Sequence, residues 1–391
     1  MNASAPGAVV VGGDYQGLAI ARSLGRRGVD VVVVDDELSI SRFSRYVSRS
    51  VRVAGLREHR RTIETLLAIA DRLGLDGWVL YPTREETVAA IARHREELVP
   101  RFRVPTPPWE VVRWAWDKRN TYARAAELGI PAPRTWTLSG LDDLASVDGE
   151  PPFVIKPAIK EHFLYATRRK AWSAATRAEL ETRVADAAEL IGPAEVIVQE
   201  LIPGPGAAQL AYCGFFKDGH AHARMTVRRR RQHPPDFGRS STLAQTIEDP
   251  GLTEPSERFL RSIGYYGLVE VEYKYDERDG QAKLLDVNAR TWGYHGLGAR
   301  AGVDFPAHLY ADQLGLPPPD RGLARTGVSW VRLATDVPTA GLELVRGALG
   351  WREYLASLRS VRVESVFARE DPLPGVAELA LLPYLALKRG F

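Results

Sequence analysis

Apolar residues near the start of the chain form two short continuous runs with a helix-spaced segment between them. Residues 9–11 and 31–34 are all valine, as expected for strands that are covered on both faces of a parallel sheet. Between them, apolar residues recur at helical spacing over 18–24, and Gly28 follows as a helix stop. This order predicts a strand, a glycine turn, a helix and a second strand, which is the opening of an α/β domain.

The alternation of helical and extended patterns continues up to a proline-rich stretch. A helix is predicted near 58–73, a short strand at 77–81 and a second helix near 83–98. The proline-rich segment 99–110 indicates the first domain boundary.

The middle of the chain alternates between strands and helices that carry several polar side chains. The strand "PPFVIKPA" contains Lys156, a helix is predicted near 176–191, and the strand "EVIVQELIPG" follows. The "KDGH" turn at 217–220 lies between two alternating stretches and predicts a hairpin. Beyond about 320 the pattern indicates mixed helical segments. The apolar tail "GVAELALLPYLALKRGF" predicts a docking helix or, alternatively, an interfacial membrane helix.

Composition narrows the class of protein. The 391 residues are 45% hydrophobic and 26% charged, which is typical of a soluble globular protein with two or three domains. Lys and Arg (52) nearly balance Asp and Glu (49), so no nucleic-acid partner is expected. The one cysteine, Cys213, excludes an internal disulfide framework and fits a cytoplasmic location. We expect no signal peptide and no membrane span, because no run approaches the roughly 18 apolar residues that a spanning helix needs.

The glycine loop after the first strand matches a dinucleotide-binding fingerprint only in part. The pattern G-x-G-x-x-G needs a second glycine where this chain has Asp14, because the backbone there approaches a pyrophosphate closely. An aspartate would also repel that anion. Asp35 or Asp36 would fill the ribose-binding role. A Rossmann-like domain used for packing or for a small substrate is the preferred interpretation, and an NAD(P)- or FAD-dependent oxidoreductase is the alternative.

The stretch "LLDVNARTWG" places polar residues two apart in an otherwise apolar run. In a strand, Asp286, Asn288 and Arg290 share one face, while the apolar residues between them, beginning with Leu285, take the other. A face that carries an acid, an amide and a guanidinium makes a poor core, and it suits a site for a cation and a phosphate.

A second strand precedes this one and adds another acid. The run "GLVEVEYKYD" ends in a hairpin, and a three-residue loop at 278–280 would set Glu272 opposite Asp286. Two carboxylates and an amide oxygen, that of Asn288, form an all-oxygen site of the kind that Mg²⁺ prefers. The alternative is a structural ion-pair network of the two acids with Arg290.

Two lysines lie at the edges of predicted elements. Lys118 precedes a helix, and Lys156 comes directly off an apolar strand. A lysine there is a point charge suited to a polyphosphate, although each one taken alone is better explained as a solvated surface charge.

Five motifs in order resemble the ATP-grasp ligases, in particular the bacterial carboxylate–amine ligase branch that is similar to D-aspartate ligases. They are "DKRNTYARAAELGIPAPRTW", "FVIKPA", "IVQELIPG", "GLVEVEYKYD" and "LLDVNAR". The resemblance covers about residues 5–320. The segment "PAIKEHFLYATRRK" departs from it, because it lacks the glycine-rich phosphate loop of many ATP-grasp enzymes.

The resemblance implies which residues bind ATP and metal. ATP is expected at Lys118, Lys156, Lys170, Gln199, Glu200, Leu201, Ile202 and Gln209. In that set the lysines serve the phosphates, Glu200 the adenine amino group, and Gln209 the ribose. Mg²⁺ or Mn²⁺ is expected at Glu272, Asp286 and Asn288.

The resemblance also implies catalytic roles for three arginines. Arg290 is expected to hold phosphate or acyl phosphate, and Arg228 and Arg231 to lie near the carboxylate substrate. The alternative for the run of four arginines at 228–231 is a charged strand edge.

The implied fold is α/β, with α+β character in the ATP-grasp part. It comprises a Rossmann-like domain at 1–110, a small lobe at 111–202, a large lobe at 203–320 and a C-terminal helical extension at 321–391. The implied activity joins a small-molecule carboxylate and an amine, such as amino acids or peptides, through an acyl phosphate. The motifs G-x-S-x-G, H-E-x-x-H and paired C-x-x-C are absent from the sequence. A non-catalytic ATP-binding protein is a further alternative, and a homodimer is the default assembly.

Overall fold

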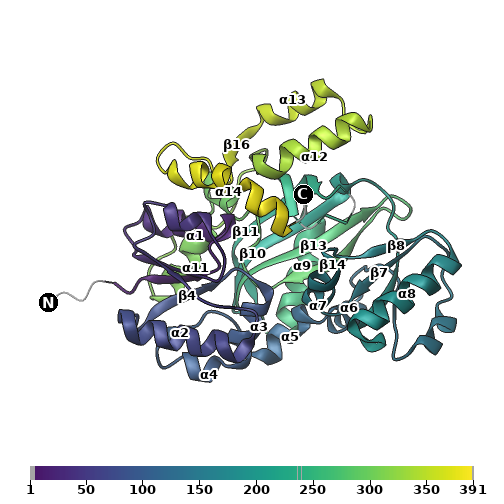
Figure 1. Ribbon diagram of the computed structural model, residues 1–391, viewed down its shortest axis with the longest axis horizontal. Coiled ribbons are helices and arrows are strands. Elements are labelled where there is room, and N and C mark those ends of the chain that lie inside the picture. The colour runs from purple at the N-terminus through teal and green to yellow at the C-terminus, as the bar shows by residue number, and fades with distance from the viewer. Residues whose placement is uncertain (1–4, 236, 239, 390–391) are drawn as a thin grey trace.

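The computed structural model describes residues 5–235, 237–238 and 240–389, which form three sheets with helices around them. Figure 1 shows the first sheet and its helices at one end of the molecule, the second sheet at the other end, and the third between them. The last helices of the chain lie at the top of this view.

The N-terminal part is a five-stranded parallel sheet with strand order β3-β2-β1-β4-β5. The strands are β1 Ala8–Val11, β2 Val31–Asp35, β3 Arg49–Arg52, β4 Trp78–Pro82 and β5 Phe102–Arg103. The helices are α1 Tyr15–Gly25, α2 His59–Leu73, α3 Glu85–Arg93 and α4 Arg95–Leu98, with a 3-10 turn η1 at Ile40–Phe43. Strands β1 and β2 are buried along their whole length, which explains their continuous valines. The predicted strand–helix–strand opening is present, whereas the helix predicted near 83–98 is broken at His94.

The second sheet is antiparallel and has strand order β6-β9-β7-β8. Its elements are α5 Trp109–Trp116, α6 Lys118–Glu127, β6 Thr135–Thr137, β7 Phe153–Pro157, α7 Lys160–Thr167, β8 Trp172–Ala174, α8 Arg177–Ile191 and β9 Val196–Glu200. One face packs on α7 and α8 through a core that includes Phe163, Leu180 and Val184. Helix α7 takes up the segment after Lys156 where a glycine-rich loop was missing from the sequence.

The third sheet has seven strands in the order β14-β13-β10-β11-β12-β15-β16. Its first part comprises η4 Gly206–Ala208, β10 Gln209–Lys217, β11 His220–His233, β12 Ser240–Ile247, α9 Pro250–Ser262, β13 Gly267–Asp276, β14 Gln281–Asn288, α10 Gly296–Ala301 and α11 Phe305–Gln313. One face, with Cys213 and Met225, packs on the N-terminal part. The other face, with Val269 and Val271, packs on α5 and α9.

The C-terminal segment adds both strands and helices. Its elements are β15 Ser329–Val331, α12 Leu333–Val345, α13 Trp351–Arg359, β16 Val361–Glu364 and α14 Leu373–Arg389. The predicted helical extension is thus wrong in part, because β15 pairs with β12 and carries β16 into the same sheet. The apolar run of β15 is only three residues long, so its pattern could not distinguish a strand from a helix.

The tail helix α14 packs against η1 of the N-terminal part. A buried ion pair between Arg22 and Asp371, with 2.9 Å between Nε and Oδ2, fixes the start of this contact. Residues 390–391 of the predicted tail helix lie outside the described residues. Among the helices that the structure describes, none combines the length and the apolar character needed to cross a membrane.

Candidate active site

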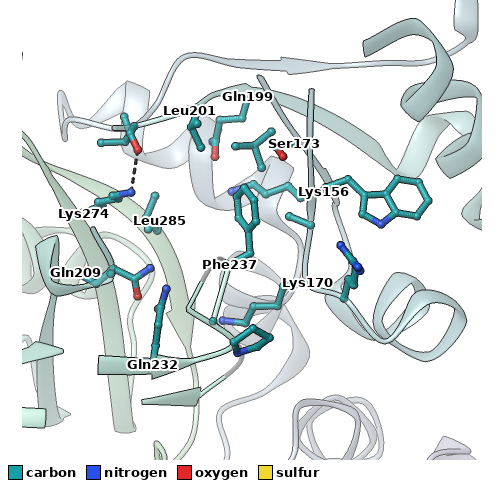
Figure 2. A pocket seen from close by; sticks show the side chains of 18 of the residues that line it. Lys156, Lys170, Ser173, Gln199, Leu201, Gln209, Gln232, Phe237, Lys274 and Leu285 are labelled. Atoms are coloured by element: carbon teal, nitrogen blue, oxygen red, sulfur yellow. Dashed lines mark hydrogen bonds between the residues drawn. The ribbon is translucent and has the colours of Figure 1, made fainter. Parts of the chain in front are cut away.

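A cavity of about 890 Å³ lies between the second and third sheets. Strands β7, β8 and β9 line one side, strands β10, β11, β13 and β14 line the other, and α12 reaches its edge. Figure 2 shows Lys156, Lys170 and Gln199 reaching in from the side of the second sheet, with Gln209 and Lys274 opposite them.

The acids of β13 and β14 stand in the predicted register. Glu272 lies opposite Asp286 and Glu270 lies opposite Asn288. The hairpin loop, however, has four residues at 277–280, because Asp276 already pairs with Gln281. A bulge restores the register, so the predicted pairing is present although the predicted three-residue loop is wrong.

The bulge falls at Leu285 and changes the direction of its side chain. Leu284 pairs with Tyr273 and Asp286 with Glu272, which leaves Leu285 as the extra residue. Leu284 and Val287 lie in the core, whereas Leu285 lines the cavity. The expectation that Leu285 faces away from the polar residues is therefore wrong, because a bulge interrupts the two-residue period.

Asn288 connects two buried glutamates. Its Nδ2 donates to Glu270 Oε2 and to Glu272 Oε1, both at 3.0 Å. Burial and repulsion from Glu272 raise the pKa of Glu270 to about 7. Sequence reasoning missed Glu270, although it lies two residues before Glu272 in the strand pattern and so shares its face.

Cationic side chains neutralise the other two acids. Lys118 Nζ lies 2.8 Å from Asp286 Oδ1, and Arg229 Nη2 lies 3.3 Å from Glu272 Oε2. Burial by itself would raise the pKa of Glu272, but Arg229 and Lys170 hold it far below its usual value. Burial opposes ionisation of Asp286 as well, but Lys118, Lys160 and Lys170 together outweigh it, so the pKa of Asp286 is also lowered.

These donors fit a hard metal ion by their chemistry. The set consists of carboxylate and amide oxygens, which Mg²⁺ and related cations prefer. Within the part of the chain that the structure describes, no group of three or more His, Cys, Asp or Glu takes the arrangement of a metal site. Asp286 and Glu272 are held in ion pairs with Lys118 and Arg229.

The predicted phosphate lysines face the same cavity. Lys156 extends from β7, and its Nζ donates to the Tyr122 hydroxyl. Burial and the nearby Lys118 lower the pKa of Lys156 to about 7. Burial lowers the pKa of Lys170 to about 8, against the opposing effect of Glu272.

Lys160 is a lysine that sequence reasoning missed. It begins α7 and lines the cavity with the three predicted lysines. Its position four residues after Lys156, in the segment that replaces a glycine-rich loop, was the available signal.

The predicted adenine segment lines the far end of the cavity. Glu200 ends β9 and forms ion pairs with Arg278 at 2.9 Å and Lys283 at 3.4 Å. Leu201 and Ile202 follow it along the wall. The side chain of Gln199 donates to Thr135 Oγ1, and Gln209 accepts from Arg229. Because of its ion pairs with Arg278 and Lys283, the carboxylate of Glu200 already has cationic partners.

The arginines of β11 take different positions. Arg228 is exposed and does not line the cavity, whereas Arg229 is buried and reaches Glu272. Arg231 is buried in a two-pronged pair with Asp336 of α12, at 2.9 and 2.8 Å. Sequence reasoning missed Arg229 because the two-residue period of β11 does not say which face meets the cavity.

Arg290 lies behind the acidic cluster. Its Nη2 is 2.6 Å from Glu85 Oε1 at the start of α3 and 3.4 Å from Asn288 Oδ1. It therefore connects the N-terminal part to β14 beside the cluster.

The N-terminal glycine loop is closed by internal contacts. Gly13 N donates to Asp35 Oδ2 at 2.6 Å, and Arg84 pairs with Asp35 and Asp36, both at 2.6 Å. A Cβ at Gly13 would lie only 2.4 Å from Ser41 Oγ, so side chains already fill the space beside the loop. Both acids proposed for a ribose are held by Arg84, which argues against a dinucleotide there.

Comparison with known sequences identifies the fold family. The sequence family described as "ATP-grasp in the biosynthetic pathway with Ter operon" matches residues 215–335, which include β13 and β14. The region that contains the acidic hairpin therefore matches an ATP-grasp family. It is 24% identical to a D-aspartate ligase of Enterococcus faecium (strain Aus0004) over 300 residues, covering 72% of this chain and 70% of that protein.

Solved structures agree at the level of the fold. An L-amino acid ligase from Bacillus licheniformis superimposes with a TM-score of 0.66 at 16% identity, covering 84% of this chain and 79% of that one. A carboxyaminoimidazole ribonucleotide synthase from Aspergillus clavatus, complexed with ATP, gives a TM-score of 0.62 at 18% identity, covering 82% and 80%. The prediction of an ATP-grasp enzyme of the carbon–nitrogen ligase type is confirmed by these relatives. ATP with a metal ion is the cofactor class of such enzymes.

Proposed function

We propose that this ATP-grasp protein joins the carboxylate of an amino acid or small peptide to an amine, with ATP converted to ADP and phosphate. The observation that carries the proposal is the meeting of two charge clusters in one cavity. Three lysines of the small lobe, Lys118, Lys156 and Lys170, face Glu272 and Asp286 of the large lobe. The D-aspartate ligase and L-amino acid ligase relatives support the substrate class.

The proposed reaction has two displacements. A carboxylate oxygen of the acid substrate attacks the γ-phosphorus of ATP, the bond to the β-phosphate oxygen breaks, and ADP leaves with an acyl phosphate formed. The amine nitrogen then attacks the acyl carbon, phosphate leaves, and the amine loses a proton. Neither step needs a protein nucleophile, which agrees with the buried and unreactive environment of Cys213.

The side chains of the cavity would bind and neutralise the reacting groups. Lys118, Lys156 and Lys170 would hold phosphate oxygens, Arg229 would sit beside the transferred group, and Arg290 would support the acids from behind. Glu272, Asp286 and Asn288, joined by Glu270, would hold Mg²⁺ or Mn²⁺, which offsets charge on the phosphate oxygens when bound. Lys118 and Arg229 would then exchange their carboxylate partners for phosphate.

The base of ATP would lie at the other end of the cavity. Leu201, Ile202 and Leu285 offer apolar contacts, and Gln199, Glu200 and Gln209 offer polar ones. The proposed domains remain a Rossmann-like part at 1–110, a small lobe at 111–202, a large lobe at 203–320 and an extension from 321. A cytoplasmic location and a homodimer stay predictions.

The proposal is tested with pairs of amino acids or dipeptides, ATP and Mg²⁺, by measuring ADP release and product mass. We expect one ADP for each amide formed, and no release without an acid substrate. Full-rate hydrolysis of ATP by water would contradict ligation, and nucleotide binding without any turnover across the panel would favour a non-catalytic ATP-binding protein.

A further inference from the structure

The cavity carries more positive charge than its acids and a bound nucleotide account for. Among the described residues that line it, ten are Lys or Arg and three are Asp or Glu. The whole chain has a net charge of only +3. Positive charge is therefore concentrated at this cavity rather than spread over the surface.

The inner cations already have partners or a proposed role. Lys118 pairs with Asp286, Arg229 pairs with Glu272, and Lys274 donates to the carbonyl of Ile202. Other inner lysines face the expected position of the triphosphate. What remains is a group of arginines at the edge.

These edge arginines come from two separate parts of the chain. Arg168, Arg169 and Arg183 belong to the small lobe, and Arg346 caps the end of α12 in the C-terminal segment. All four are exposed, and none forms an ion pair with an acid of the described chain. Arg183 instead stacks over Trp172, with 5.4 Å between its guanidinium carbon and the ring centroid.

The backbone at Arg168 is unusual for an arginine. The residue ends α7 in the left-handed region, with φ of 59° and ψ of 18°, where glycine or asparagine is the usual choice. A residue with a Cβ is disfavoured in that region, because its Cβ approaches the following carbonyl oxygen. An arginine at a position where glycine is usual indicates that its guanidinium serves a function at the cavity edge.

The helix that ends at Arg346 is anchored by a buried ion pair near its start. Asp336, near the start of α12, accepts from Arg231 of β11, and Arg231 also lies over the Tyr354 ring of α13. This pair fixes α12 against the large sheet, so that Leu342 and Arg346 line the cavity opposite the small lobe. The C-terminal segment therefore completes the edge of the cavity.

We propose that the acid substrate is a multiply anionic small molecule, with further carboxylate or phosphate groups that Arg168, Arg169 and Arg346 bind beside the reacting carboxylate. The proposal rests on the proposed ligase function. Guanidinium groups recognise carboxylate and phosphate through paired hydrogen bonds, so either chemistry suits these arginines. Their location on both sides of the edge would let the substrate connect the small lobe to the C-terminal segment.

The test uses the full-length protein saturated with Mg²⁺ and a nonhydrolysable ATP analogue, so that the nucleotide site is filled. Calorimetry then measures the binding of tetraglutamate, inorganic pyrophosphate and tetraglutamine. We expect one of the two anionic probes to bind at least about tenfold more tightly than tetraglutamine, and more weakly as salt is raised. Tetraglutamate binding would indicate further carboxylates, and pyrophosphate binding would indicate phosphate.

Variants on the two sides of the cavity edge test which arginines bind the anionic probe. Arg346→Glu and Arg169→Glu should each weaken the bound anionic probe by about tenfold and leave the affinity for the analogue within about twofold. Arg352→Glu, an exposed arginine of α13 that does not line the cavity, is the matched control and should change neither. If one variant fails to fold, the other still tests the idea, because Arg169 lies in the small lobe and Arg346 in the C-terminal segment.

The opposite results overturn the inference. These are no binding of either anionic probe to the saturated protein, binding of tetraglutamine as tight as that of the anionic probes, or binding of the anionic probe by both edge variants as tightly as by the wild-type protein. Weaker binding of the analogue in the edge variants would assign these arginines to the nucleotide and also refute the inference. Failure of the analogue to bind the wild-type protein would instead refute the proposed function.

Discussion

Glu272 faces Asp286 across the β13–β14 pair because Leu285 occupies an extra position in β14. The bulge lets Leu284 stay in the core while Asp286, two residues later, faces the cavity. Without it, the two-residue period would place Leu284 and Asp286 on one face. The acidic cluster therefore depends on one bulged residue.

Neighbouring leucines should separate stability from binding. Leu284→Ala should lower the free energy of unfolding by about 2–5 kcal/mol, because it opens a cavity in the core. Leu285→Ala should leave stability nearly unchanged and weaken ATP binding severalfold, because it removes an apolar wall of the cavity. Denaturant unfolding and nucleotide titration of both variants check this. Equal destabilisation by both would contradict the different positions of the two side chains.

Asn288 should be required for metal-dependent turnover. Asn288→Ala removes the amide that connects Glu270 and Glu272, and we expect loss of Mg²⁺-dependent ADP release with a stability cost of about 1–3 kcal/mol. Asn120→Ala on α6 is the control. Chelation of the metal should abolish turnover of the wild-type protein. Unchanged turnover of Asn288→Ala would refute the metal assignment.

The low pKa of Lys156 predicts a pH dependence of nucleotide binding. Burial and Lys118 hold that pKa at about 7 in the nucleotide-free protein, and a bound triphosphate would raise it. Binding should then take up a proton, so affinity should fall as pH rises, by at most about tenfold per unit above pH 7. Calorimetry in buffers of different ionisation enthalpy measures the proton uptake. Lys156→Met should bind more weakly and with a flatter profile below about pH 8, and a wild-type profile that is already flat would sink the prediction.

Arg231 should act on stability rather than on the chemical step. Arg231→Met leaves Asp336 buried without its partner, which should lower the free energy of unfolding by about 3–5 kcal/mol. Adding Asp336→Asn should recover part of that loss. Arg230→Ala, an exposed neighbour, should change it by less than about 0.5 kcal/mol. A stable Arg231→Met protein with normal unfolding but no activity would favour the catalytic role predicted from the sequence.

The N-terminal glycine loop should not bind a dinucleotide. Asp35 and Asp36 are held by Arg84, and side chains fill the space beside Gly13. Titration with NAD(H), NADP(H) and FAD, followed by fluorescence and calorimetry, should show no specific binding to the wild-type protein. Tight binding that Asp35→Asn removes without unfolding the protein would revive the oxidoreductase alternative.

The sequence by itself determined the local features of this protein. Continuous valines specified buried parallel strands, and the two-residue spacing of Asp286 and Asn288 specified a shared face, because both follow from backbone geometry within one element. The order of short motifs was sufficient to indicate the ATP-grasp family.

Only the tertiary structure decided which side chains meet. Arg229 rather than Arg228 reaches Glu272 because β11 is fixed by pairing with β10 and β12, and such register depends on packing across the whole sheet. Likewise β15 joins β12 across about ninety residues, as Leu243 pairs with Val331, and this brings the C-terminal segment to the cavity. Pairing between distant segments follows from the burial of whole faces, which no local pattern contains.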